Sequence, residues 1–524
     1  MTGHGSESYF VLGEGLLAES GEGHPDGGVT AMAAQAAPPF RFSRLGPKGT
    51  GKQLGEPNRK KVGHAMTAGG GGDGKIPAGY TYLGQFIDHD LTFDKTQVTL
   101  GQNVSPAQLL QARSPSLDLD SMYGAGPADP ESAKFYAGAV KLKVGRPAGS
   151  GPAARAGFDL LRGAGNTDAK KRKAVIADPR NDENLAVAQT HAAMIRFHNR
   201  VATTLPASVP VAQRFEQARE LVVKHYQWMI RTDYLRRICA TAVVNDVFNN
   251  GRKAFEVGAV PTDVPTMPIE FSVGAFRLGH AMIRGRYSWN SNFDFDSATL
   301  GDLFTFSATS SNLGGDTRLA SIWVADFRRL YDFKAAGHPS LGVPKAQFNV
   351  ARRIDTTLVN PLDKLPRGSF GGPSMPADDV RRNLAFRNLT RARMVRLATG
   401  QQMVAFLKGK GVSVSALTRA QIRDGNNGAD LSGLTQAQRD DVLTKTPLWF
   451  YILREAEFND GKLAGVGARI VAETIHRAIE GSTHSIVRDP AWRPSLGPSD
   501  TTFRMPDLLF FAFEGRKRLL APNG

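Results

Sequence analysis

Cysteine is almost absent from this chain of 524 residues, in which Cys239 is the only one. A single thiol excludes internal disulfides, Cys-x-x-Cys redox chemistry and zinc sites built from several thiolates. Long apolar runs are also missing, so no membrane-spanning helix is predicted. The first residues show neither a basic start nor an apolar core, so no standard secretory leader is visible. These absences favour a soluble protein, cytoplasmic by default or exported by a leaderless route, and leave its oligomeric state open.

Acidic side chains are outnumbered, with 49 Asp and Glu against 65 Lys and Arg, which gives a formal net charge of +16. The simplest interpretation is a basic protein surface. Attraction to nucleic acid, anionic lipid or an acidic polymer is the alternative. The basic residues are scattered, and no nucleic-acid-binding motif is present. We therefore expect no specific nucleic-acid partner.

Residues 1–75 are rich in Gly, Ala and Pro, which predicts a loosely ordered arm that buries little apolar surface. This arm contains "GPKGTGK" (46–52), which matches part of a phosphate-binding loop. Gln53 follows where that loop needs Ser or Thr to bind magnesium, and no strand pattern precedes it. Both departures argue against a nucleotide site of that class.

From residue 76 onward the apolar spacing is helical, with little strand alternation. The spacing predicts helices over four ranges: 182–204, 212–240, 270–284 and 377–397. Long irregular stretches separate them, such as 285–320 and 355–375. The prediction is a mainly α protein, with one large helical domain over 76–524 and long loops.

The stretch "YLGQFIDHDLTFD" (82–94) places polar side chains in a run that otherwise predicts a buried helix. On a helix, Gln85, Asp88 and His89 share one face, and Asp90 points about a quarter-turn away. A histidine there could be a core residue with satisfied hydrogen bonds, part of a metal-ligand pair, or a catalytic base. The stretch alone does not decide between these.

Five motifs in order along residues 76–400 resemble those of the animal-type haem peroxidases of the peroxidase–cyclooxygenase superfamily. They are "GQFIDHDLTFD" (84–94), "SPSLDLDSMYG" (114–124), "DPRNDEN" (178–184), "AFRLGH" (275–280) and "RNLTRAR" (387–393). The resemblance implies haem b between a distal and a proximal helix. It also implies oxidation of small donors, such as halides or phenols, by hydrogen peroxide through a ferryl intermediate.

The resemblance assigns the iron ligand and the catalytic groups. His280 is expected as the proximal iron ligand, with its second ring nitrogen held by Asn388. On the open face, His89 is expected to move a proton between the two peroxide oxygens. Arg180 would stabilise the charge that develops as the O–O bond breaks, and Gln85 would hold a water or a small anion.

Carboxylates receive two further roles from the same resemblance. Asp88 and Glu183 match the residues that form ester links to haem methyl groups; without those links they are hydrogen-bonding acids beside the haem. Asn184 stands where a third link through sulfur would need Met, so none is expected. A calcium site is expected from Asp90, Ser114, the carbonyl of Ser116, Asp118 and Asp120. An Asp-rich turn without metal is the alternative.

Two arginines bear on the choice of reaction. Arg277, three residues before His280, matches the peroxidase branch, whereas the fatty-acid dioxygenase branch needs a radical-carrying Tyr there. Arg391 falls where the family has an arginine near a haem propionate or the proximal pocket. His191 and His198 match no catalytic position and are interpreted as scaffold. The alternatives to a peroxidase are a fatty-acid dioxygenase of the same superfamily and a non-catalytic basic binding or adhesion protein.

Overall fold

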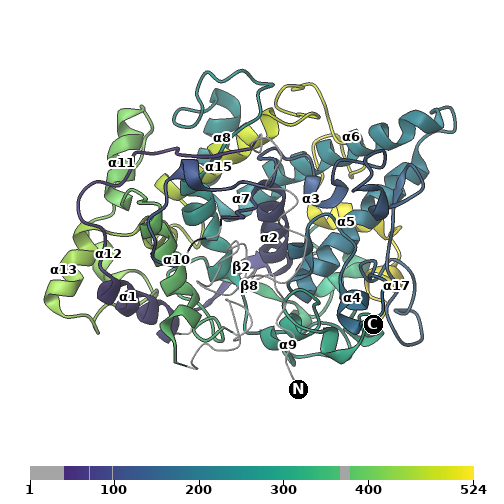
Figure 1. Ribbon diagram of the computed structural model, residues 1–524, viewed down its shortest axis with the longest axis horizontal. Helices are drawn as coiled ribbons and strands as arrows, with labels where there is room; N and C mark the ends of the chain where they lie inside the picture. The colour runs from purple at the N-terminus through teal and green to yellow at the C-terminus, as the bar shows by residue number, and fades with distance from the viewer. Residues whose placement is uncertain (1–39, 70, 97, 99, 366–377) are drawn as a thin grey trace.

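Helices are the main regular elements of the computed structural model, which describes residues 40–69, 71–96, 98, 100–365 and 378–524 (Figure 1). This confirms the mainly α fold class. The α-helices are α1 (Glu56–Ala68), α2 (Gly79–Leu91), α3 (Asp120–Tyr123), α4 (Asp168–Arg172), α5 (Leu185–Thr204), α6 (Val211–Met229), α7 (Leu235–Ile238), α8 (Thr241–Asn250), α9 (Leu300–Thr305), α10 (Leu384–Met394), α11 (Gly400–Gly409), α12 (Arg419–Asp424), α13 (Gln436–Thr444), α14 (Leu448–Glu457), α15 (Gly465–Glu480), α16 (Met505–Ala512) and α17 (Lys517–Leu520).

The strands of the described residues are short and pair two by two. β1 (Phe42–Ser43) runs parallel to β5 (Met267–Pro268). The antiparallel pairs are β2 (Asp73–Pro77) with β8 (Val350–Arg352), β3 (Tyr136–Ala137) with β4 (Lys141–Leu142), and β6 (Arg286–Tyr287) with β7 (Ala298–Thr299). Such pairs tie distant segments together but build no sheet core, so the helices enclose the apolar interior.

Helix α2, the predicted buried helix, lies near the middle of the view in Figure 1 and packs against α5. All its residues are buried except Gln85 and Asp88. No side chain caps its start; instead the N–H of Gly79 donates to the carbonyl of Leu330 (2.9 Å). At its end, the N–H of Thr92 donates to the carbonyl of Asp88 (2.8 Å). Because neighbouring segments satisfy its backbone, α2 depends on tertiary packing more than on its own sequence.

The segment after Ile269 is helical, as predicted, but it is not a regular α-helix. Residues Glu270–Gly274 form a π-helical turn, and Ala275–Met282 form a 3-10 helix, labelled η6 and η7. Gly274 lies at the junction with φ −121° and ψ −91°. Since a 3-10 helix has three residues per turn, Arg277 and His280 lie on the same face.

Several predicted bounds differ from the observed ones. The predicted helix over 212–240 is interrupted by a π-helical turn at Ile230–Tyr234, labelled η5, between α6 and α7. Within the predicted arm, residues 40–75 contain β1, α1 and the start of β2, and α1 packs along α10. Arg59, Val62, Gly63 and Met66 give α1 a buried face that the Gly-rich composition did not reveal. Residues 1–39 and 366–377 lie outside the described part of the chain.

No described helix is both long and apolar enough to cross a bilayer.

Candidate functional site

A cleft opens between the polar edge of α2 and the face of η7 that carries His280. It is narrow, with a cavity volume of about 40 Å³, and it is partly open to solvent. Gln85 and Asp88 line it from α2, and Arg277, Gly279 and His280 line it from η7. A Cβ atom added at Gly279 would meet no described atom within 4 Å, so open space lies beside His280. Four of the residues predicted to meet the haem therefore line one cleft.

Histidine 280 is fixed from behind by α10. Its Nδ1 lies 2.7 Å from the side-chain amide of Asn388, and both residues are buried. The ring of Trp449, on α14, meets it edge-on at 6.4 Å between centroids. The Nδ1 atom of His280 is thus held by a polar partner.

Histidine 89 lies on α2, fully buried, and its two nitrogens have different surroundings. Nδ1 is 2.9 Å from Oδ1 of Asn181. Nε2 makes no hydrogen bond to a described residue, and the nearest carboxylate oxygen, Oε1 of Glu183, is 3.7 Å away. Burial and the charge of Arg180 lower the pKa of His89 to about 3. The ring is therefore neutral near pH 7, with one nitrogen anchored and the other available.

Glutamine 85 links the distal residues into one network. Its amide nitrogen donates to Oε1 of Glu183, and its carbonyl oxygen accepts from Nδ2 of Asn184 (2.9 Å). Asn184 also caps α5, because its side-chain oxygen accepts from the N–H of Val187 (2.9 Å). Asn184, which occupies the position where a sulfur link would need Met, thus binds Gln85 and also caps the start of α5.

Arginine 180 lies in η4 (Pro179–Asp182), the 3-10 turn that leads into α5. Its guanidinium donates to both oxygens of Asp178 (3.0 and 2.7 Å) and to the carbonyl of His89 (2.9 Å). Arg113 adds a second guanidinium to Asp178 at 2.7 Å. Burial works against ionisation of Asp178, but the two arginines hold its pKa well below its usual range. Arg180 is therefore placed beside His89 by a buried ion network, and it does not line the cleft.

Three residues of this arrangement escaped the sequence analysis. Asp178 and Asn181 belong to the "DPRNDEN" motif, yet nothing there indicated their partners. Arg113 lies far from both in sequence. The only signal for them in the sequence was the alternation of charged and amide residues around Arg180. The same alternation is typical of a capped turn.

The remaining cofactor residues lie in different surroundings. Burial raises the pKa of Asp88 to about 6, although Arg277 and Arg180 favour its ionised form. Glu183 lies beside His89 and Gln85, as described above. Arg391 does not line the cleft and instead pairs with Asp94 at 3.0 Å.

The predicted calcium residues come together only partly. Asp90 accepts hydrogen bonds from Leu119 and Ser121, while Asp118 accepts from Ser482 and Thr483. Burial, and then Asp120, raise the pKa of Asp90 to about 8. Among the described residues, no group of three or more His, Cys, Asp or Glu side chains is arranged to hold a metal ion. Ser114 accepts from the N–H of Ser116 at 3.3 Å. Calcium binding stays a prediction.

Known proteins resemble parts of this sequence or resemble its fold. Residues 75–315 match the model of the family described as animal haem peroxidase. A segment of 111 residues is 34% identical to thyroid peroxidase of Rattus norvegicus. This segment makes up 20% of this chain and 11% of the rat protein.

Among solved structures, peroxidase A from Dictyostelium discoideum has a TM-score of 0.54 at 14% identity, over 90% of this chain and 95% of that one. Fatty acid alpha-dioxygenase of Arabidopsis thaliana also has a TM-score of 0.54, at 10% identity, over 89% of this chain and 75% of that one. A Y-to-F variant of the Oryza sativa dioxygenase, solved with palmitic acid, has a TM-score of 0.51 at 12% identity, over 90% of this chain and 80% of that one. At these identities the structural likeness establishes the fold alone.

The Asp178 network generates a stability prediction. Asp178→Asn would leave the guanidiniums of Arg113 and Arg180 buried without a full counter-charge. We expect a loss of about 3–5 kcal/mol in the free energy of unfolding, measured by urea denaturation. The control is Asp168→Asn, which removes an exposed carboxylate 3.7 Å from Lys171 and should cost about 1 kcal/mol or less. Equal losses in both variants would show that the network contributes no more than a surface ion pair.

Proposed function

We propose that this chain, which carries an animal haem peroxidase domain of the peroxidase–cyclooxygenase superfamily over residues 75–315, uses hydrogen peroxide to oxidise a small donor such as a halide or phenol. The observation that carries the proposal is the pairing of two buried histidines with two amides. Asn388 anchors one ring nitrogen of His280 across the cleft from α2, and Asn181 anchors one ring nitrogen of His89. In each pair an amide holds one ring nitrogen, and in His89 the other nitrogen, Nε2, makes no hydrogen bond to a described residue.

The cleft brings together an imidazole, a guanidinium and a carboxylate, from His280, Arg277 and Asp88, which are side chains that could meet a haem. Bound haem would supply an iron centre able to give two electrons to peroxide, and His280 is the residue that would hold it. Ligation through Nε2 requires a proton on Nδ1, which must then donate to an oxygen. The second amide atom of Asn388, Oδ1, makes no hydrogen bond to a described residue. A half-turn of the amide lets Oδ1 of Asn388 accept a hydrogen bond from Nδ1 of His280.

On the distal side the tautomer of His89 follows from Asn181. An amide oxygen accepts a hydrogen bond, so the proton of the neutral ring lies on Nδ1 and the lone pair on Nε2. Nε2 can therefore take a proton from peroxide and return it to the departing oxygen. The low pKa of His89 keeps Nε2 unprotonated. Gln85 and Glu183 lie beside this nitrogen and restrict where a small molecule can bind.

Arginine 180 supports this step by its charge. Nη2 and Nε are engaged by Asp178 and the His89 carbonyl, whereas Nη1 donates to no described residue. A fixed cation next to a buried site stabilises negative charge that develops on a departing oxygen. We propose this role for Arg180, with Asp88 and Glu183 as the carboxylates that meet the haem edge.

The second candidate is a fatty-acid dioxygenase. It is favoured by a fold likeness to the plant dioxygenases as high as that to the amoebal peroxidase. Two tyrosines, Tyr82 and Tyr234, also line the cleft. Against it, Arg277 stands three residues before His280, where the radical-carrying Tyr is expected in that branch. Its guanidinium is turned back to the carbonyl of Ser272 (2.8 Å).

The peroxide step depends on His89. In the haem-loaded chain, His89→Ala should slow the peroxide-induced absorbance change about 10²- to 10⁴-fold, because the general base is lost. Stopped-flow absorbance measures this rate. His191→Ala is the matched control, since His191 is equally buried but has no hydrogen-bonded partner among the described residues. An unchanged rate in His89→Ala would remove His89 from the mechanism.

The pH dependence tests the protonation state of His89. A pKa of about 3 leaves the ring neutral well below its ordinary pKa, so the base is lost only as pH falls through about 3. We expect the rate of the peroxide reaction to vary less than about twofold between about pH 5 and 8. The measurement uses an Asp88→Asn background, because Asp88 titrates at about 6. An acid limb centred near about 6.5 would contradict the burial argument.

Peroxidase and dioxygenase chemistry differ in the oxidant consumed. With peroxide and a phenol, we expect donor oxidation; with palmitic acid and air, we expect no oxygen uptake by the oxygen electrode. The fatty acid is chosen because the rice dioxygenase was solved with it. Oxygen uptake that stops in Tyr234→Phe, with no phenol oxidation, would favour the dioxygenase instead.

A further inference from the structure

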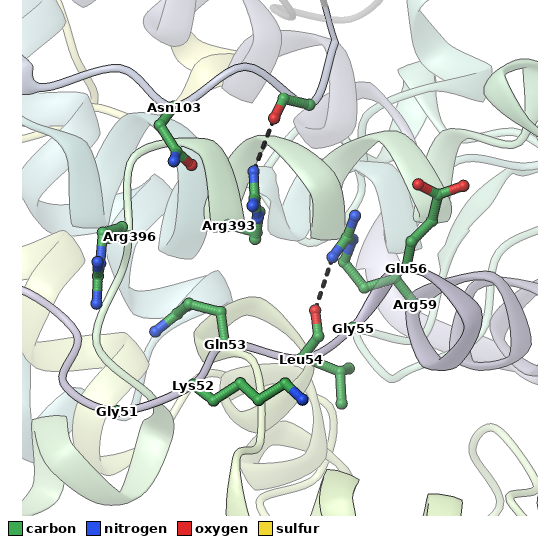
Figure 2. A pocket seen from close by; sticks show the side chains of 11 residues that line it. Gly51, Lys52, Gln53, Leu54, Gly55, Glu56, Arg59, Asn103, Arg393 and Arg396 are labelled. Atoms are coloured by element: carbon green, nitrogen blue, oxygen red, sulfur yellow. Dashed lines mark hydrogen bonds between the residues drawn. The ribbon is translucent and has the colours of Figure 1, made fainter.

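A second, strongly basic pocket lies apart from the cleft, between the loop before α1 and the end of α10. It encloses about 460 Å³ (Figure 2). Its lining joins three distant segments: Gly51–Arg59, Gly101 with Asn103, and Arg393 with Arg396. Only Gly51 and Lys52, the last two residues of the Gly-rich "GPKGTGK" stretch, line the pocket, and that stretch lacks the features of a magnesium-nucleotide loop.

Four cations line this pocket without carboxylate partners. Lys52, Arg59, Arg393 and Arg396 form no ion pair with any described residue. The single acid in the lining, Glu56, pairs with Lys60 at 2.8 Å. Buried arginines elsewhere have counter-charges, as Arg180 and Arg454 do. The pocket therefore concentrates positive charge, of which Glu56 offsets only a part, beside Arg59.

The cations are held in place by neutral oxygens, as Figure 2 shows for two of them. Arg393 donates to the carbonyl of Gly101 (2.7 Å), and Arg59 donates to the carbonyl of Leu54 (2.6 Å). Arg59 also donates to Oγ1 of Thr390 at 3.2 Å. Anchors of this kind keep guanidiniums oriented without cancelling their charge, which lowers the entropy lost when an anion binds.

The same region also contains hydrogen-bond donors that have no partner among the described residues. The backbone N–H groups of residues 50–55 donate to no described residue. Nε of Arg396 is buried and has no hydrogen-bond partner among the described residues. Arg396 also has φ +49°, in the left-handed region that non-glycine residues seldom adopt, and its carbonyl accepts from the N–H of Gly49 (2.9 Å). Free amides and guanidinium donors around one hollow are the groups that bind phosphate oxygens.

We propose that this pocket binds a small molecule carrying two or more phosphate groups. One phosphate alone would not neutralise four cations. A second hollow of about 320 Å³, lined by Arg44 and Lys48, shares Asn103 and Arg396 with the first, so it extends the basic surface for a longer anion. Magnesium is not required, because arginine and lysine supply the counter-charge. The site is independent of the proposed peroxidase reaction.

The test is calorimetric titration of the full chain with pyrophosphate and with orthophosphate. We expect pyrophosphate to bind at least about tenfold more tightly, since it engages more of the cations. The double variant Lys52→Gln/Arg396→Gln should weaken pyrophosphate binding at least about tenfold, because two charge-assisted contacts are lost. The matched control is Lys408→Gln/Lys410→Gln, which removes the same charge from exposed positions of the adjacent helix region and should change affinity less than about twofold.

Two outcomes would overturn the proposal. Equal weakening in both double variants would show that pyrophosphate responds only to the overall charge of +16. The second concerns residues 1–39, which carry five acidic residues and no Lys or Arg. If the wild-type chain does not bind, but a full-length chain with Glu7, Glu14, Glu19, Glu22 and Asp26 neutralised does, the natural occupant is that acidic segment. Neither outcome affects the haem cleft, whose spectrum can be recorded on the same variants.

Discussion

The ion network centred on Asp178 is the constraint on which the distal side depends. One carboxylate, buried between two guanidiniums, fixes Arg180 in a turn that also presents Asn181 and Glu183. The same guanidinium reaches back to the carbonyl of His89, so the turn and α2 are joined through a charge that cannot move into solvent. Breaking such a network costs far more than a surface ion pair, because the remaining charges stay buried. The position of the base and that of the cation are therefore set together.

The segment that carries His280 is positioned in a different way, by its irregular helix geometry. Here the chain departs from regular helix geometry, through a π-helical turn and then a 3-10 helix, and brings Arg277 and His280 onto one face. Helix α10 supplies Asn388 from behind, and α14 supplies Trp449. Irregular helices of this kind re-aim side chains at the expense of weaker backbone hydrogen bonds. The surrounding helices stabilise a conformation that this segment would not hold alone.

Helix α10 connects the two sites. Asn388 faces the cleft side, while Arg393 and Arg396, one to two turns later, line the basic pocket together with residues of α1. The packing of α1 along α10 buries Arg59 and brings it beside Thr390. Repulsion from Arg393, added to burial, lowers the pKa of Arg59, which shows how closely these charges are held. The helix that anchors His280 thus also lines the basic pocket.

The sequence by itself determined the mainly α class, the buried helix around His89 and the motif order that indicated the haem peroxidase domain, because helical periodicity and short motifs are local. Tertiary structure alone decided which nitrogen of His89 is anchored, that Arg180 is clamped by Asp178 and Arg113, and that Arg391 pairs with Asp94. It also decided that a Gly-rich loop near residue 50 meets arginines near residue 395. Apart from the local pair Asp178 and Arg180, these contacts join residues tens to hundreds of positions apart, and their energies come from burial and charge pairing, which no local pattern records.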